Sequence, residues 1–211
     1  MPTTAPAPFF LAQPAVGTAG HPAVVVIMEG NGMSQQLLRV CQRLAHEGYT
    51  AIAPDLFHQF GGSDGDRAMA EGWYSALNID QALDDIRQCI SYVKKAGATS
   101  AGITGFCMGG MFSYLAATRG LDVQAAVGFY GRIADKLGTP ACPHLHFFGG
   151  RDAFIPASEI EASRAHHPDE VTVYEDAEHG FMRDGSDSYH AEHAPVAWKR
   201  TLEFFAEHLH S

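Results

Sequence analysis

Positive charge is scarce in this sequence: its 211 residues contain 14 Lys and Arg against 24 Asp and Glu, for a formal net charge of -10. A protein that binds nucleic acid needs a basic stripe to neutralise phosphates, so the composition excludes that class of partner. Long hydrophobic runs are also missing, since no stretch reaches the roughly 18 to 20 apolar residues of a membrane span. The start, MPTTAPAPFF, lacks the basic segment of a secretory signal. We therefore expect a soluble, cytoplasmic protein with no nucleic-acid or membrane partner.

Cysteine is rare and widely spaced. Cys41, Cys89, Cys107 and Cys142 form no C-x-x-C pair, and the first two fall on the apolar stripes of expected helices. We therefore expect no disulfide. Nucleotide-binding loops are missing too, because no glycine-rich segment is followed by the Lys and Ser or Thr of a phosphate-binding loop. The sequence contains no sign of a cofactor, and we expect none.

Alternating short apolar runs and helical stripes predict the fold class. Hydrophobic residues make up 46% of the chain, and its length fits one domain over residues 1–211, with residues 1–8 frayed. The expected strands are residues 23–28, 49–53, 100–104, 123–130, 144–148 and 171–174. Between them, apolar residues recur three or four positions apart, as in the helices expected to begin near Ser34 and Ile79. This alternation predicts an α/β fold with a mostly parallel sheet and helices on both faces.

The segment GFCMGG at residues 105–110 is the most informative motif. It follows the predicted strand 100–104, precedes a helix-like stretch at residues 111–118, and places Cys107 in a Gly-x-nucleophile-x-Gly pattern. A strand that turns sharply into a helix strains its apex residue, and the surrounding glycines leave room for the turn. The start of the helix then offers free N–H groups and a positive dipole end, which favour a thiolate. The alternative is a buried structural cysteine beside a glycine turn.

A cysteine nucleophile needs a base and a third group that orients the base. Asp152 follows the predicted strand 144–148 within FFGGRDAFIP, and His179 follows the predicted strand 171–174 within EDAEHGF. The order nucleophile, acid, histidine is the one expected for an elbow on a parallel sheet. Asp152 has an alternative interpretation as a loop aspartate that binds its own backbone.

Other histidines compete with His179, because the chain contains 12 of them. His190 and His193 have the spacing to face one another on a helix as metal ligands. No third ligand of suitable spacing stands out in the sequence, so we expect no metal site.

Several segments together resemble the dienelactone hydrolase (carboxymethylenebutenolidase) family, and the resemblance covers most of the chain. The segments are VVVIMEGNG, GYTAIAPDLF, GFCMGG, VGFYG, FFGGRDAFIP and EHGFMR. The family implies an α/β-hydrolase fold in which Cys107 is the nucleophile, His179 the base and Asp152 the acid that orients it. The amino-terminal region is shorter than is usual in the family, with room for one edge strand around residues 9–13.

The resemblance also implies roles that spacing alone does not. In the family, the carboxylate at the Glu29 position contacts the resting thiol and moves when substrate arrives. Two arginines hold the substrate carboxylate, and the matching residues are Arg67 and Arg183. The family's EIFG reads EGNG here from Glu29 onward, which puts small or polar residues beside the oxyanion position. The backbone amides of Gly30 and Met108 can still hold an oxyanion, because that role needs N–H groups rather than side chains.

These roles imply a hydrolase that cleaves a small carboxylated ester or an enol-lactone, of the kind met in aromatic degradation, through a thioester on Cys107. The expected partner is an anionic small molecule, and the expected assembly is a monomer or small homo-oligomer. A general carboxylesterase or thioesterase is the alternative within the hydrolases. An alternative of another class is a redox sensor in which Cys107 is oxidised and Cys142, at the start of a strand, is the only candidate resolving thiol.

Overall fold

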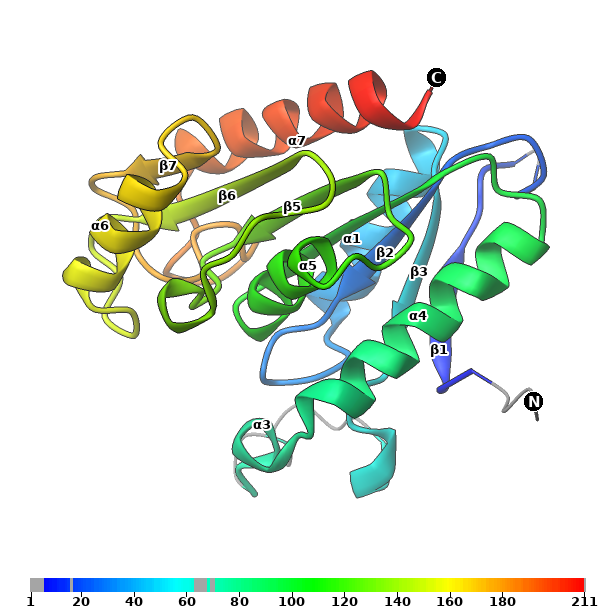
Figure 1. Cartoon of the computed structure of the whole chain (residues 1–211), viewed down its shortest axis with the longest axis horizontal. Helices are drawn as coiled ribbons and strands as arrows, with labels where there is room; N and C mark the ends of the chain where they lie inside the picture. The colour runs from blue at the N-terminus through cyan, green and yellow to red at the C-terminus, as the bar shows by residue number, and fades with distance from the viewer. Residues whose placement is uncertain (1–5, 16, 63–67, 69–70, 211) are drawn as a thin grey trace.

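The computed structural model describes residues 6–15, 17–62, 68 and 71–210. Among them, a seven-stranded sheet has the order β1-β3-β2-β4-β5-β6-β7 (Figure 1). The edge strand β1 is antiparallel to β3, and all other neighbours pair in parallel. The strands are β1 (Phe9–Ala12), β2 (Ala23–Ile27), β3 (Thr50–Pro54), β4 (Ala101–Phe106), β5 (Ala125–Phe129), β6 (His144–Gly149) and β7 (Val171–Tyr174). The predicted mostly parallel sheet and its short amino-terminal edge strand are confirmed.

The central strands form where the sequence has continuous apolar runs. Every residue of β2, β4 and β5 is buried, as expected for parallel strands that helices cover on both faces. Parallel strands end at one edge of a sheet, so the residues that follow them gather there. The segments after β2, β4, β5, β6 and β7 carry Glu29, Cys107, Tyr130, Asp152 and His179 respectively.

Helices cover both faces of the sheet (Figure 1). The longer ones are α1 (Gln35–His46), α4 (Ile79–Lys95), α5 (Met108–Thr118), α6 (Ala157–His166) and α7 (His193–Leu209). Gly102 of β4 faces α7, whereas Gly105, three positions on and therefore on the opposite side of the strand, faces α5. The helix α1 shares the α7 side, where the Arg43 guanidinium lies 4.3 Å from the centre of the Trp198 ring. The helix predicted to begin near Ser34 does so, because the Ser34 hydroxyl accepts a hydrogen bond from the Leu37 N–H at 3.2 Å.

Two expectations about the start and middle of the chain have different outcomes. The first eight residues are not all frayed: Ala7 is buried, and the Pro8 carbonyl accepts a hydrogen bond from the Asp55 N–H at 2.8 Å. That expectation was wrong for these two residues, while residues 1–5 lie outside the described part. Arg67 also lies outside it, six positions in sequence before the short helix α3 (Trp73–Ala76). No helix of the described residues is long and apolar enough to cross a membrane.

Candidate active site

Cys107 lies at the turn between β4 and α5. Its φ of 54° and ψ of -117° are unusual for a residue with a side chain and cost about 1–3 kcal/mol. Backbone hydrogen bonds hold this conformation: the Cys107 N–H donates to the Phe129 carbonyl at 2.9 Å, and the Cys107 carbonyl accepts from Gly110 at 3.0 Å and Met111 at 3.2 Å. The side chain is partly exposed, unlike the buried Cys41. The apex residue is therefore partly accessible to solvent.

The glycines around Cys107 are required by close backbone approaches. A Cβ atom on Gly105 would come closer than 3.0 Å to the Gly109 backbone, and one on Gly109 would come as close to the Ile27 carbonyl. A Cβ on Gly110 would meet the Phe129 carbonyl in the same way. Because all these neighbours are backbone atoms, no side-chain rotation relieves the overlap. The predicted need for glycine at the elbow is therefore confirmed.

His179 and Asp152 form a buried hydrogen-bonded pair. His179 Nδ1 lies 2.7 Å from Asp152 Oδ2, and the two side chains are 9% and 0% exposed. Asp152 Oδ1 accepts from the N–H groups of Phe154 at 2.8 Å and Ile155 at 2.9 Å. The carboxylate thus binds its own loop with one oxygen and the histidine with the other. Both interpretations of Asp152 from the sequence describe part of what this side chain does.

The surroundings of His179 favour its protonated form. Burial lowers the pKa of the imidazole, but the hydrogen bond to Asp152 and the interaction with Cys107 outweigh it and raise the pKa from 6.5 to about 9. Nδ1 is bound to Asp152, so Nε2 is the nitrogen left for the thiol side. The structure therefore brings together the three residues that the sequence predicted from separate loops.

Glu29 is held by partners other than the thiol. Its Oε1 accepts a hydrogen bond from the Tyr130 hydroxyl at 3.2 Å, and its Oε2 accepts one from Arg183 Nε at 3.0 Å and forms an ion pair with Arg183 Nη2 at 2.9 Å. The Glu29 side chain is 9% exposed, so this charge is paired in a largely buried setting. The resemblance implied a contact between Glu29 and the resting thiol of Cys107. In this structure the carboxylate is instead engaged by Arg183 and Tyr130.

Tyr130 is a site residue to which no sequence pattern assigned a role. It adopts a φ of 38°, it is buried, and its ring centre lies 4.9 Å from that of His179. Burial and the neighbouring Glu29 carboxylate raise the pKa of Tyr130 well above its usual value, so the phenol remains a hydrogen-bond donor. The segment VGFYG contained this residue, but a positive φ at a tyrosine has no signature in sequence.

Two exposed aromatic side chains lie beside His179 and Gly30. Phe154 is 75% exposed, and its ring centre lies 4.9 Å from that of His179. Tyr74 of α3 is 48% exposed, and its Cβ would lie 3.8 Å from a Cβ placed on Gly30, next to Glu29. Both aromatic rings are therefore accessible to a molecule that approaches the loops after β2 and β6. The sequence offered no signal for either residue beyond its position near a loop.

Two backbone amides are free in the described part of the chain, one at the elbow and one in the segment after β2. Met108 opens α5, and among the described residues no acceptor is bonded to its N–H or to that of Gly30. The first amides of a helix have no partner within the helix, and they carry the positive end of its dipole. These are the two amides expected to hold an oxyanion.

Cys142 precedes β6, whereas Cys107 follows β4. Because these strands run parallel, the two thiols lie at opposite ends of the strands. Burial raises the pKa of Cys142 to about 11, which disfavours its thiolate. All four cysteines are free.

Comparison with known proteins identifies the family. Residues 9–209 match the model described as the dienelactone hydrolase family. The chain belongs to this family. A carboxymethylenebutenolidase of Pseudomonas putida is 30% identical over 205 residues, which cover 89% of this chain and 86% of that protein. An Escherichia coli K12 protein named "Putative carboxymethylenebutenolidase" is 34% identical over 224 residues, with coverages of 95% and 82%.

A solved structure supports the same assignment. The crystal structure of a "Putative Dienelactone Hydrolase" from Klebsiella pneumoniae is similar to this chain, with a TM-score of 0.83 and 30% sequence identity. The match covers 95% of this chain and 93% of the Klebsiella chain. The fold is therefore that of the α/β-hydrolases. The family places the protein among the carboxylic ester hydrolases of the dienelactone hydrolase type.

Proposed function

We propose that the protein hydrolyses a small ester or enol-lactone that carries a carboxylate, through a thioester on Cys107. The observation that carries this proposal is the hydrogen-bonded Asp152–His179 pair, whose imidazole interacts with a partly exposed thiol on a strained turn. These contacts support the roles of nucleophile for Cys107, base for His179 and orienting acid for Asp152. The name carboxymethylenebutenolidase of the Pseudomonas putida relative agrees with a lactone substrate.

The first half of the proposed reaction forms the thioester. The Cys107 thiolate attacks the lactone carbonyl carbon, a C–S bond forms, and the carbonyl electrons move to the oxygen. The amides of Gly30 and Met108 hold this oxyanion. When the carbonyl re-forms, the ring C–O bond breaks and expels an enolate, which takes the proton of the His179 imidazolium. The enolate is a good leaving group, so a stabilised thiolate is a sufficient nucleophile.

The second half releases the product. The neutral His179 now takes a proton from water, and the resulting hydroxide attacks the thioester carbonyl. The C–S bond breaks, which restores the Cys107 thiolate and leaves a new carboxylic acid that ionises. Asp152 keeps the imidazole in one orientation throughout, because its second oxygen is fixed by the 153–155 turn.

Arg183 gives the site a cation for the substrate carboxylate. Its Nε and Nη2 are bound to Glu29, which leaves Nη1, and the side chain is 36% exposed. A substrate carboxylate near this guanidinium would compete with Glu29 for it, because Arg binds carboxylates through paired N–H groups. Arg67 is proposed as the second arginine on the resemblance alone. Phe154 and Tyr74 supply the apolar walls for the rest of a small substrate.

Replacing Glu29 tests its proposed link to Arg183. In the Glu29→Gln variant the charge is removed while the amide oxygen still accepts from Tyr130, so Arg183 is freed for the substrate. We expect KM for a carboxylated lactone to fall and KM for a neutral aryl ester to stay unchanged. Equal changes in both KM values would contradict a role in carboxylate recognition.

Steady-state turnover of cis- and trans-dienelactone tests the proposal as a whole. We expect turnover by the wild type, none by Cys107→Ala, and unchanged turnover by the matched control Cys142→Ala. Intact-mass analysis of a His179→Asn variant mixed with substrate should show the acyl adduct on Cys107. Activity in Cys107→Ala would refute the mechanism.

A general carboxylesterase is the second candidate, because Arg183 is already paired with Glu29 and so is only partly available to a substrate. Good turnover of simple aryl esters with none of either dienelactone would establish this alternative.

A further inference from the structure

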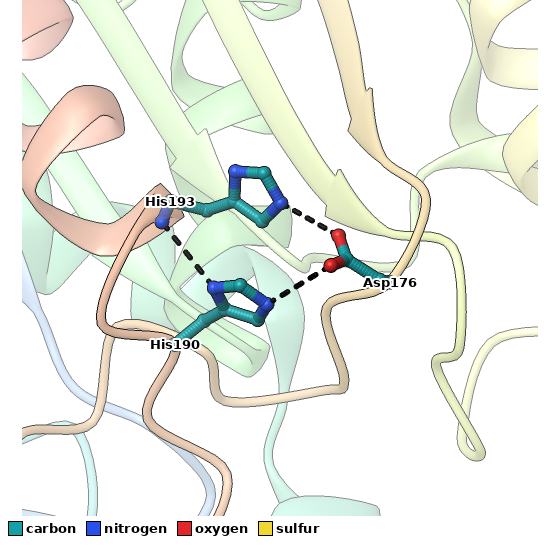
Figure 2. Close-up of side chains that lie close together, drawn as sticks. All are labelled: Asp176, His190 and His193. Atoms are coloured by element: carbon teal, nitrogen blue, oxygen red, sulfur yellow. Dashed lines mark hydrogen bonds and ion pairs between the residues drawn. The ribbon is translucent and has the colours of Figure 1, made fainter.

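Three side chains with metal-binding donors meet outside the proposed active site. Asp176 lies two residues after β7, His190 lies in the segment before α7, and His193 is the first residue of α7. His193 Nε2 lies 2.6 Å from Asp176 Oδ1, and His190 Nε2 lies 3.4 Å from Asp176 Oδ2. One donor atom from each residue lies within 4.8 Å of the others. Figure 2 shows both imidazoles directed at the single carboxylate.

The sequence predicted no metal site because His190 and His193 lacked a third ligand. The structure supplies this third ligand as Asp176, which comes from a different segment. Asp176 follows β7, which pairs with β6, and it lies beside the segment that leads into α7 and carries the two histidines. The two histidines do not share a helix face, because His193 is helical and His190 precedes the helix. The reason for expecting no metal is therefore removed.

We propose that Asp176, His190 and His193 bind one divalent transition-metal ion, zinc in the first place, with water completing the coordination. Two imidazole nitrogens and one carboxylate oxygen suit zinc, whereas magnesium and calcium prefer oxygen ligands alone. Zinc binds such donors at about 2.0–2.2 Å in a tetrahedron, so neighbouring donors lie about 3.4 Å apart. His190 Nε2 lies 3.4 Å from Asp176 Oδ2 and His193 Nε2 lies 2.6 Å from Oδ1, so the carboxylate must rotate and move away from His193 to present one oxygen to an ion that both nitrogens bind.

The rings around the site hold the two histidines near their binding positions. The imidazoles of His190 and His193 stack with centres 4.2 Å apart at 26°, and His193 stacks on Tyr174 at 4.5 Å and 21°. The three proposed ligands remain accessible, because their side chains are 23%, 25% and 53% exposed for His190, His193 and Asp176. A metal ion can therefore enter from solvent and meet ligands that lose little freedom.

Binding requires a shift of protons within the imidazoles. His190 Nδ1 accepts a hydrogen bond from the His193 N–H at 3.3 Å, so its proton is on Nε2 and faces Asp176. A metal on Nε2 moves that proton to Nδ1, which breaks the long bond to the His193 amide. The proton of His193 moves likewise from Nε2 to Nδ1, for which the described residues provide no competing bond. The His193 amide should therefore exchange faster with solvent once the metal is bound.

The placement of the site gives the metal a structural consequence. The ion would connect Asp176 to His190 and His193 and so close the segment 177–192, which carries His179 and Arg183. A ligand that binds only the folded state stabilises it, and the stabilisation grows with the logarithm of the free ligand concentration above Kd. Metal binding is therefore expected to raise the melting temperature without taking part in the proposed ester chemistry.

The test is a zinc and cobalt titration of the full chain in a Cys107→Ala background, so that the thiol beside His179 contributes no ligand. Isothermal titration should find one zinc per chain, and cobalt should give visible bands without a thiolate charge-transfer band. Asp176→Asn and His193→Asn should each weaken zinc binding at least about tenfold. Even residues that only hydrogen-bond to a metal ligand contribute about 10- to 100-fold to metal affinity. The matched control Asp169→Asn, at another exposed aspartate, should bind zinc like the parent.

Circular dichroism without metal verifies that each variant is folded, and His190→Asn provides a third ligand variant. Equal zinc affinity in Asp176→Asn and Asp169→Asn would overturn the proposal, as would the absence of zinc binding to the folded parent. Neither result depends on turnover, so the outcome for the metal site and the outcome for the proposed hydrolase function are decided by separate measurements.

Discussion

The protonation of His179 provides the sharpest test of the site. Its pKa is raised from 6.5 to about 9 by Asp152 and Cys107 against the effect of burial. At 1.36 kcal/mol per pKa unit, this difference corresponds to about 3 kcal/mol in favour of the charged form in the folded protein. The sign follows from linkage: this stabilisation is fully present below pH 6.5 and is lost as the pH rises through about 9.

Removing the charge of Asp152 should therefore change the pKa of His179. In the Asp152→Asn variant the pKa of His179 is expected to fall towards or below 6.5, because burial then acts with less opposition. NMR of protein labelled at the imidazole carbons measures the titration, and a His179→Asn spectrum assigns the signal. Glu178→Gln, which removes a charge from the adjacent exposed residue, is the matched control and should leave the titration unchanged. A wild-type His179 that titrates near 6.5 would refute the reasoning.

Two further predictions concern stability. Gly109→Ala should lower the free energy of unfolding, measured in urea, by about 3 kcal/mol. The new Cβ overlaps the Ile27 carbonyl, and this overlap outweighs the gain of about 1 kcal/mol in helix propensity. The control is Gly138→Ala, whose Cβ meets nothing closer than 3.7 Å and which should fold normally. Burial lowers the pKa of His144 to about 4 and of His146 to about 3, so the unfolded chain binds more protons below pH 6.5. Acidification from pH 6.5 to 4.5 should then lower the free energy of unfolding by about 2 kcal/mol per histidine. In urea titrations at several pH values, His144→Leu should remove about half of the loss that the two histidines cause together. An unchanged dependence of the free energy of unfolding on pH would contradict this reasoning.

The sequence by itself determined the strands, the elbow and the order of the proposed catalytic residues. Continuous apolar runs made β2, β4 and β5 central strands, and GFCMGG fixed a turn that only glycine neighbours permit. These features depend on short-range periodicity and on local backbone sterics, which a single segment contains. The same local rules placed Asp152 and His179 after later strands, at the edge where Cys107 lies.

The tertiary structure alone decided which side chains meet. Glu29 pairs with Arg183 and Tyr130, although these residues are far apart in the chain, and Asp176 joins His190 and His193 from another segment. Such contacts depend on the order of strands in the sheet and on where each loop leaves it, and no local pattern encodes either. Exposed loop residues such as Phe154 have no hydrophobic period to reveal them, so only their packing on neighbouring groups shows where they lie.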